Sequence, residues 1–191
     1  MTHAHHQSIV AERQEPLRQG YQQGTADPGI LDGARALFER RDDPLRARVL
    51  PNNFEGPPLP LGIHRALGGY HQRANPGDLL CAALAGCLHL TTRMIADRLG
   101  IALADLEVTV HAQADARGSL LVDPEVLVRF QRMRCDVHLR ILGDPGAGRL
   151  RVLTQMAERC CVVLRTLEGG TEVVTDWDIA QDIALPGDGS E

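Results

Sequence analysis

Residues 75–90 read NPGDLLCAALAGCLHL, and the rest of the predicted fold is arranged around this stretch. Asn75 is a favourable N-cap, Pro76 suits the first helical position, and Asp78 complements the helix dipole. The pattern predicts a long helix that continues to about Leu99. Its first half is apolar on every face, which is typical of a helix buried on all sides.

Short extended and helical patterns flank this helix. A short extended piece, 63–67, precedes it. Residues 106–114 and 131–142 alternate apolar with polar side chains, which predicts two half-buried strands. Residues 144–161 have helical spacing, and 171–179 are predicted to form a closing strand. The order of strand, buried helix, two strands, helix and strand indicates an α+β fold.

The N-terminal part of the chain differs in character. Residues 1–47 are polar, rich in Gln and Arg, and we expect an arm that packs on the body or on a partner subunit. Asp27 as N-cap and Pro28 after it predict a helix through Phe38. Prolines make 50–62 an irregular connection. We therefore expect a partly helical arm, 1–47, a main domain, 48–185, and a disordered tail, 186–191.

Composition excludes several classes of function. The net charge of −5 argues against a nucleic-acid surface, because phosphate binding needs clustered cations. All 20 basic residues are Arg, so a Schiff-base mechanism has no lysine amine to use. The sequence indicates neither a membrane-spanning run nor a signal peptide, which predicts a cytoplasmic protein.

Five cysteines are the candidate reactive groups. They are Cys81, Cys87, Cys135, Cys160 and Cys161, and none forms a C-x-x-C pair, which argues against a zinc site and a thioredoxin-like motif. We expect neither a metal nor an organic cofactor. Cys81 lies 240° around the helix from Cys87, and Cys135 is on the inward side of its strand, so both are predicted to pack in the core.

Cys87 allows two interpretations. Most free cysteines are small buried hydrophobic residues, and Cys87 lies mid-helix, where the helix dipole lowers a thiol pKa very little. A reactive thiolate there would need a nearby Arg and a route for a substrate. Cys161 has separate support, because it precedes a short helical run, 162–167, whose free N–H groups can stabilise a thiolate.

Two stretches together resemble the OsmC/Ohr family. Residues 66–69 form a Gly-Gly turn, and 75–87 form a Pro-capped helix that ends in a Cys. Residues 157–167, with Cys161 before a short helix, are similar to the family's second motif. The segment 130–133 also resembles the start of a strand in the family. The resemblance as a whole spans roughly 60–180.

The resemblance implies a function and an assembly. It implies an intertwined homodimer with two long helices at its centre, an antiparallel sheet and sites at the subunit interface. It also implies a thiol peroxidase: Cys87 attacks an organic hydroperoxide, becomes a sulfenic acid, and is resolved by a disulfide with Cys161. An external dithiol then reduces the disulfide by exchange. Cys160 falls where the family shows no fixed Cys, so the two neighbours could exchange roles.

One position departs from the pattern of the family. In its peroxidase-active branches a Glu commonly follows the Pro that opens the helix, and here that position is Gly77. Asp78 points to the opposite face from Cys87 and is predicted to be a helix-start residue. A matching Arg is not evident, and the candidates are Arg46, Arg48, Arg65 and Arg73. The chain therefore resembles the branch without the helix-start Glu.

Two other functions stay open on sequence alone. The first is a non-catalytic dimer that binds an apolar ligand between its subunits, with vestigial or sensory cysteines; the replacement of Glu by Gly77 favours it. The second is disulfide exchange with a protein partner.

Overall fold

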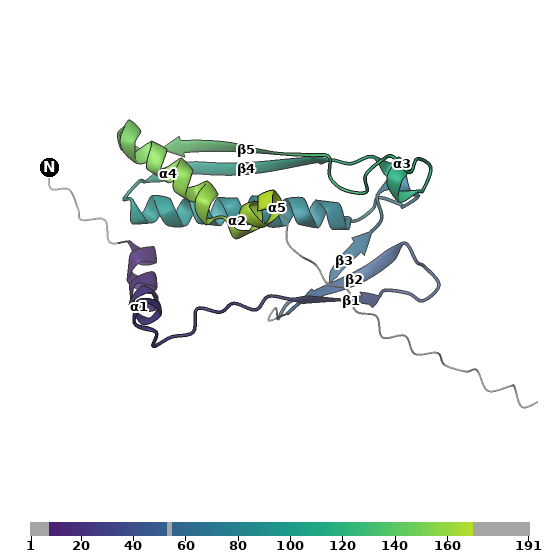
Figure 1. Cartoon of the computed structure of the whole chain (residues 1–191), viewed down its shortest axis with the longest axis horizontal. Coiled ribbons are helices and arrows are strands. Elements are labelled where there is room, and N and C mark those ends of the chain that lie inside the picture. The colour runs from purple at the N-terminus through teal and green to yellow at the C-terminus, as the bar shows by residue number, and fades with distance from the viewer. Residues whose placement is uncertain (1–7, 53–54, 170–191) are drawn as a thin grey trace, which may run out of the picture.

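The structure is a computed structural model that describes residues 8–52 and 55–169, and its α+β content agrees with the sequence (Figure 1). The predicted strand 171–179 and tail 186–191 lie outside the described residues. The elements, in chain order, are α1 Ile9–Gln23, β1 Ala34–Phe38, β2 Arg46–Pro51, β3 Leu59–Gly62, the 3-10 turn η1 Arg65–Leu67, α2 Pro76–Arg98, β4 Leu103–Gln113, α3 Ala116–Ser119, β5 Arg132–Ile141, α4 Ala147–Cys160 and α5 Val162–Gly169.

The long helix α2 begins as the sequence predicts. The Asn75 side chain accepts from the N–H groups of Gly77 and Asp78, and the Asp78 carboxylate accepts from the Asn75 N–H at 2.9 Å. This capping box satisfies donors that the first helical turn leaves free. Asp78 is therefore a helix-start residue. At the other end Gly100 has a φ of +63°, a left-handed conformation that glycine adopts without strain.

The antiparallel hairpin of β4 and β5 packs on α2, with Val110 opposite Cys135 in the ladder. In Figure 1 the hairpin lies above α2, and α4 and α5 cross in front of it. Two apolar clusters fill these contacts. One surrounds Leu84 and Leu88, and the other surrounds Ala96 and Leu153. The core is thus built around α2, as the sequence predicts.

A second, three-stranded antiparallel sheet has the order β1-β2-β3. It lies below the N-terminal half of α2 in Figure 1. The prediction of a helix from Asp27 to Phe38 is wrong, because 34–38 pairs with 47–51 as a strand. The irregular connection predicted at 50–62 is also partly wrong, since β3 closes this sheet. Here pairing with a neighbouring strand overrides the local helical pattern.

The N-terminal helix α1 does contact the body, as expected for the arm. Its N-cap Ser8 donates from Oγ to Asp97 Oδ2 at 2.6 Å, and the Val10 N–H donates to the same oxygen at 2.9 Å. Arg98 Nη1 donates to Gln14 Oε1 at 2.9 Å. Polar contacts with the end of α2 therefore hold α1, and none of the α1 residues is fully buried.

One face of α2 is not covered by the residues that the structure describes. Ala82, Ala83, Gly86 and Leu90 are exposed, so the expectation of burial on all sides is wrong for a single chain. By length and composition alone this helix could cross a membrane, with a mean hydropathy of 1.6. It packs instead against the hairpin, α4 and α5, which is the environment of a core helix.

The Cys87–Cys161 site

Cys161 lies at the break between α4 and α5. The residue adopts an extended conformation, with φ of −78° and ψ of 101°, so the helical path stops there and restarts at Val162. Because α5 restarts in a new direction, its first N–H groups have no helical partners of their own. They are therefore free to bind another acceptor.

Cys161 and Cys87 belong to one apolar cluster. Cys161 is 0% exposed, and Cys87 packs against the cluster that Cys161 forms with Leu84, Leu88 and Ala157. Cys87 lies at the edge of the covered face of α2. Leu84 on one side of it is buried, whereas Leu90, three residues on, is 58% exposed. The Cys87 sulfur thus lies between the core and the uncovered face of the helix.

Neutral donors stabilise the Cys87 thiolate. Burial raises the pKa of Cys87, but hydrogen bonds from the Val163 N–H, the Cys161 thiol, the Thr91 hydroxyl and the Val162 N–H outweigh it and bring the pKa below the ordinary thiol value. Donors that bind the charged form of a group lower its pKa. A thiolate forms more readily here than on a free cysteine.

The pKa of Cys161 is shifted in the opposite direction. Burial raises its pKa to about 11, and the neighbouring Cys87 thiolate also raises it, although the Leu164 and Val163 N–H groups act in the other direction. The sequence predicts a stabilised thiolate at Cys161, whereas the structure gives the stabilised thiolate to Cys87. The full burial of Cys161 and the charge of the neighbouring Cys87 thiolate account for this difference.

The other three cysteines do not enter this pair. Burial raises the pKa of Cys81 and of Cys135, and nearby carboxylates of Asp78 and Asp136 add to it. Cys135 packs on the apolar cluster as the sequence predicts. Cys160 is exposed at the end of α4.

Gly77 faces the ring of Phe130. A Cβ built at Gly77 would lie 3.0 Å from Phe130 Cζ and 2.9 Å from Asn75 Oδ1. Ordinary side chains do not approach so closely, so a larger residue fits only if the ring and the Asn75 side chain shift. The ring of Phe130, in the loop before β5, therefore packs where the expected Glu would need room.

Three of the four arginine candidates have hydrogen-bond or ion-pair partners. Arg73 pairs with Glu39, Arg46 pairs with Asp43 at 3.2 Å, and Arg48 donates to the Phe38 carbonyl. Arg65 is exposed in η1. These pairings hold three of the four guanidinium groups within or beside the β1–β3 sheet.

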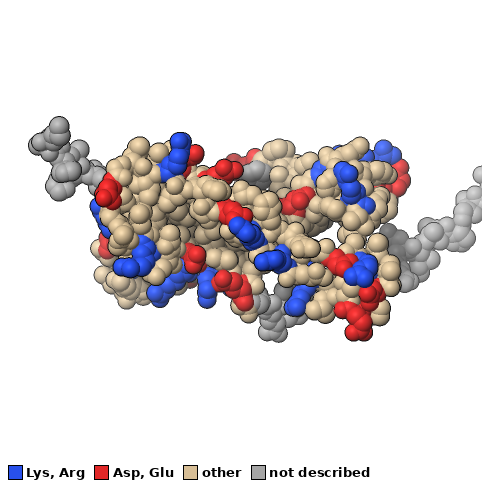
Figure 2. Space-filling view, turned by 90° about the horizontal axis from the view of Figure 1, so that it is seen from above, with Lys and Arg blue, Asp and Glu red and all other residues tan. Residues whose placement is uncertain are grey.

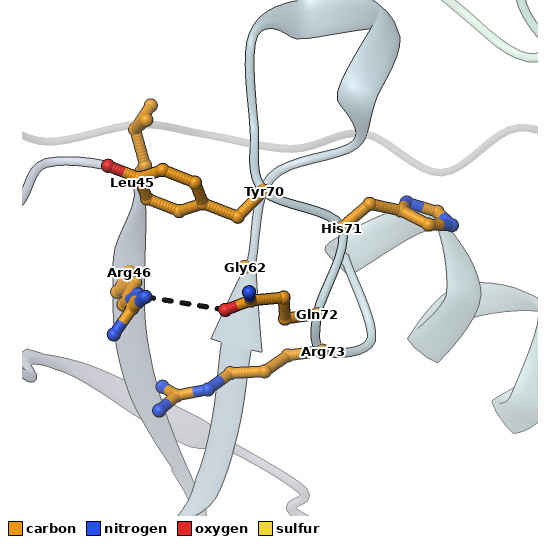
Figure 3. Close-up of a pocket in the computed structure, with 7 residues that line it drawn as sticks. All are labelled: Leu45, Arg46, Gly62, Tyr70, His71, Gln72 and Arg73. Atoms are coloured by element: carbon orange, nitrogen blue, oxygen red, sulfur yellow. Dashed lines mark hydrogen bonds between the residues drawn. The ribbon is translucent and has the colours of Figure 1, made fainter.

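Arg46 and Arg73 also line a small hollow beside β2 (Figure 3). The Arg46 guanidinium lies 5.1 Å from the centre of the Tyr70 ring and donates to Gln72 Oε1 at 3.5 Å. Such stacking and pairing hold a guanidinium in place. His71 points away from this side of the loop in Figure 3. The residues that line the hollow include no cysteine, so the hollow is separate from the thiol site.

The described part of the chain contains no cluster of three or more His, Cys, Asp or Glu suited to a metal ion. Figure 2 shows acidic and basic side chains intermixed over the face seen from above, without a broad area of one sign.

The fold and the two thiols define an α+β protein with a paired-cysteine site. A family model described as OsmC-like protein matches residues 69–176, more than half of the chain. The chain belongs to the OsmC-like family. No curated protein sequence matches it.

Solved structures agree with the fold. An OsmC-like protein from Mycoplasma pneumoniae has 13% identity and a TM-score of 0.58, over 74% of this chain and 89% of that one. An OsmC-like protein of unknown function from Vibrio cholerae has 12% identity and a TM-score of 0.60, over 73% and 95%. An organic hydroperoxide resistance protein from Legionella pneumophila has 21% identity and a TM-score of 0.51, over 75% and 93%.

Proposed function

We propose that the chain is a thiol-dependent reductase of organic hydroperoxides, with Cys87 as the attacking thiol and Cys161 as the resolving thiol. One observation carries the proposal: Cys87 packs against the apolar cluster that contains the fully buried Cys161, and the pKa of Cys87 is lowered whereas that of Cys161 is raised. A thiolate is the nucleophilic form of cysteine. Relatives named for hydroperoxide resistance support the choice of substrate class.

The reaction proceeds in two steps. The Cys87 thiolate attacks the terminal peroxide oxygen, the O–O bond breaks, and the alkoxide takes up a proton and leaves as an alcohol. Cys87 is then a sulfenic acid. The Cys161 sulfur attacks it, the S–S bond forms, and the hydroxyl leaves as water with the Cys161 proton. An external dithiol restores both thiols by exchange. None of these steps needs a metal or an organic cofactor.

We also propose that the chain acts as a homodimer through the uncovered face of α2. Ala82, Ala83, Gly86 and Leu90 form an exposed apolar stripe on this helix, and a second copy would cover it. Small residues at the centre of the stripe allow two helices to approach closely. Because Cys87 borders the stripe, the second copy would also close over the thiol and form an apolar entrance for the peroxide.

The remaining expectations complete the proposal. The net charge of −5, with acidic and basic side chains intermixed on the face seen in Figure 2, does not favour nucleic acid as a partner. We place the reaction in the cytoplasm, where dithiol reductants keep cysteines reduced.

The test is intact-mass analysis after one equivalent of cumene hydroperoxide. The wild-type chain should lose about two mass units, since a disulfide removes two hydrogen atoms. Cys87→Ser should lose none. If Cys87→Ser still consumes peroxide at the wild-type rate, Cys87 is not the attacking thiol.

A second candidate is a non-catalytic dimer that binds an apolar ligand. The contact between Gly77 and Phe130 favours it, because an aromatic ring lies where the peroxidase-active branches carry an acid. A co-purified lipid, together with peroxide consumption no faster than that of a free thiol, would support this candidate against the first.

A further inference from the structure

Two adjacent cysteines at the end of α4 differ in their exposure to solvent. Cys160 is the last residue of α4 and is the exposed member of the five cysteines, whereas Cys161, the next residue, is 0% exposed. Cys161 also belongs to the apolar cluster against which Cys87 packs. The three thiols therefore form a series that runs from the partly buried Cys87, through the buried Cys161, to the exposed Cys160.

The burial of Cys161 obstructs the last step of the proposed cycle. In the oxidised chain Cys161 would be joined to Cys87 inside the apolar cluster. Thiol–disulfide exchange requires a thiolate to reach one of the two bonded sulfurs. The Cys161 sulfur is closed to a dithiol in solution, and a second copy over α2 would cover the Cys87 sulfur as well. Reduction is therefore easier if a thiol of the chain itself contacts both the disulfide and the solvent.

The position of Cys160 suits this role. Its Cα lies about 3.8 Å from that of Cys161, the spacing of consecutive residues across a trans peptide bond. The link between the two residues is at the break in the helical path, where Cys161 is extended with φ of −78° and ψ of 101°. The Cys161 N–H donates to the Glu158 carbonyl over a long 3.4 Å. A segment with such a weak backbone bond adjusts at a lower cost than the interior of a helix.

We propose that Cys160 is a relay thiol, which passes electrons from the external dithiol to the buried disulfide of Cys87 and Cys161. The proposal rests on the proposed function of the cysteine pair and deepens it. The Cys160 thiolate attacks the Cys161 sulfur, a bond between Cys160 and Cys161 forms, and the bond between Cys161 and Cys87 breaks. Its electron pair goes to Cys87, which is free again as a thiolate.

The external dithiol then acts at the exposed end of the series. One of its thiolates attacks the Cys160 sulfur, and Cys161 leaves as a thiolate that takes up a proton. The second thiol of the reductant displaces Cys160 from the mixed disulfide, so that one dithiol is oxidised and one protein disulfide is reduced. The bond between Cys160 and Cys161 would be short-lived, because disulfides usually join Cα atoms roughly 4.4–6.8 Å apart and shorter spacings make the bond more reducible.

The experiment follows the reduction of a disulfide that is already formed in the full chain. One equivalent of diamide, which oxidises thiols without peroxide, makes the disulfide of Cys87 and Cys161, and a limiting amount of dithiothreitol reduces it. Cys160→Ser removes the relay thiol at nearly constant size. Cys81→Ser is the matched control, because it removes a cysteine outside the series. Samples are quenched with acid, alkylated and mapped by mass spectrometry, which gives the rate at which Cys87 becomes free.

Cys160→Ser should form the disulfide like the wild type but release Cys87 about tenfold more slowly, because a thiol held in the same chain has a much higher effective concentration than one in solution. Cys81→Ser should match the wild type. Equal rates in Cys160→Ser and the wild type, or an equal slowing in Cys81→Ser, would overturn the proposal. A wild-type chain that forms no disulfide with peroxide, yet shows the Cys160-dependent reduction after diamide, would instead overturn the peroxidase function and leave the relay standing.

Discussion

The Cys161 thiol donates a hydrogen bond to the Cys87 sulfur from a fully buried position at the break between α4 and α5. This interaction lowers the pKa of Cys87 and raises that of Cys161. Cys87 gives up its proton more easily than an ordinary cysteine, and Cys161 retains its own. This asymmetry separates the attacking thiol from the resolving thiol before any peroxide binds.

Removal of Cys161 should interrupt the reaction after its first step. In Cys161→Ala the sulfenic acid on Cys87 has no partner thiol, so it should persist and react with dimedone. The measurement is the mass of the Cys87 peptide after one equivalent of hydroperoxide and dimedone. Cys160→Ala is the control and should form the disulfide like the wild type. A dimedone adduct equally abundant in the wild type would argue against Cys161 as the resolving thiol.

The two thiols should titrate in separate ranges. Alkylation of Cys87 should have its midpoint below the ordinary thiol value of 9.0, while Cys161 should stay unreactive until the pH approaches about 11. The folded pKa of Cys87 is lowered, so its contribution to stability is present above 9.0 and is lost as the pH falls through the folded value. The folded pKa of Cys161 is raised, so its contribution is present below 9.0 and is lost as the pH rises toward 11.

Residue-specific alkylation rates measured across this pH range check the order of the two thiols. Thermal unfolding of the wild type and of Cys161→Ser at pH 9 and pH 11 checks the linkage. The wild type should lose more stability than Cys161→Ser between these two values. A Cys161 that alkylates before Cys87 would contradict the assignment.

Gly77→Ala should destabilise the fold, because the added Cβ would press on Phe130 and on the N-cap oxygen of Asn75. Forcing a methyl group into such a contact costs about 1–3 kcal/mol. Chemical denaturation measures the change in the free energy of unfolding. Phe130→Leu in the same chain should recover part of the loss, since it removes one of the two contacts. A Gly77→Ala chain as stable as the wild type would show that the ring moves aside freely.

Gly86→Leu tests the proposed dimer. A Cβ at Gly86 meets no atom within 4 Å in the single chain, and leucine favours a helix over glycine by about 1 kcal/mol. The variant chain should therefore fold well. If a second copy crosses α2 here, the larger side chain should separate the subunits, which analytical ultracentrifugation would detect as a monomer. Val152→Leu on the exposed side of α4 is the control and should leave the assembly unchanged.

The sequence by itself determined the elements whose signals are local. The cap at Asn75 and Pro76 defined the start of α2, and alternation defined β4 and β5. The resemblance carried by the two cysteine motifs gave the family. The predictions of these elements are confirmed because capping and periodicity depend on neighbours within a few residues. The prediction of a helix from Asp27 to Phe38 was wrong because the conformation of 34–38 depends on pairing with β2, which is distant from it in local sequence terms.

Only the tertiary structure decided the chemistry of the thiols. No local rule assigns the first N–H groups of α5 to a cysteine 75 residues earlier in the chain, yet the Val163 and Val162 N–H groups lower the pKa of Cys87. Tertiary packing also sets the surroundings of Gly77, which faces the ring of Phe130 from the loop before β5. Electrostatic stabilisation acts through space and depends on which donors the fold brings within hydrogen-bond distance. The low thiol pKa of Cys87 is therefore a property of the packed helices and not of its own helix.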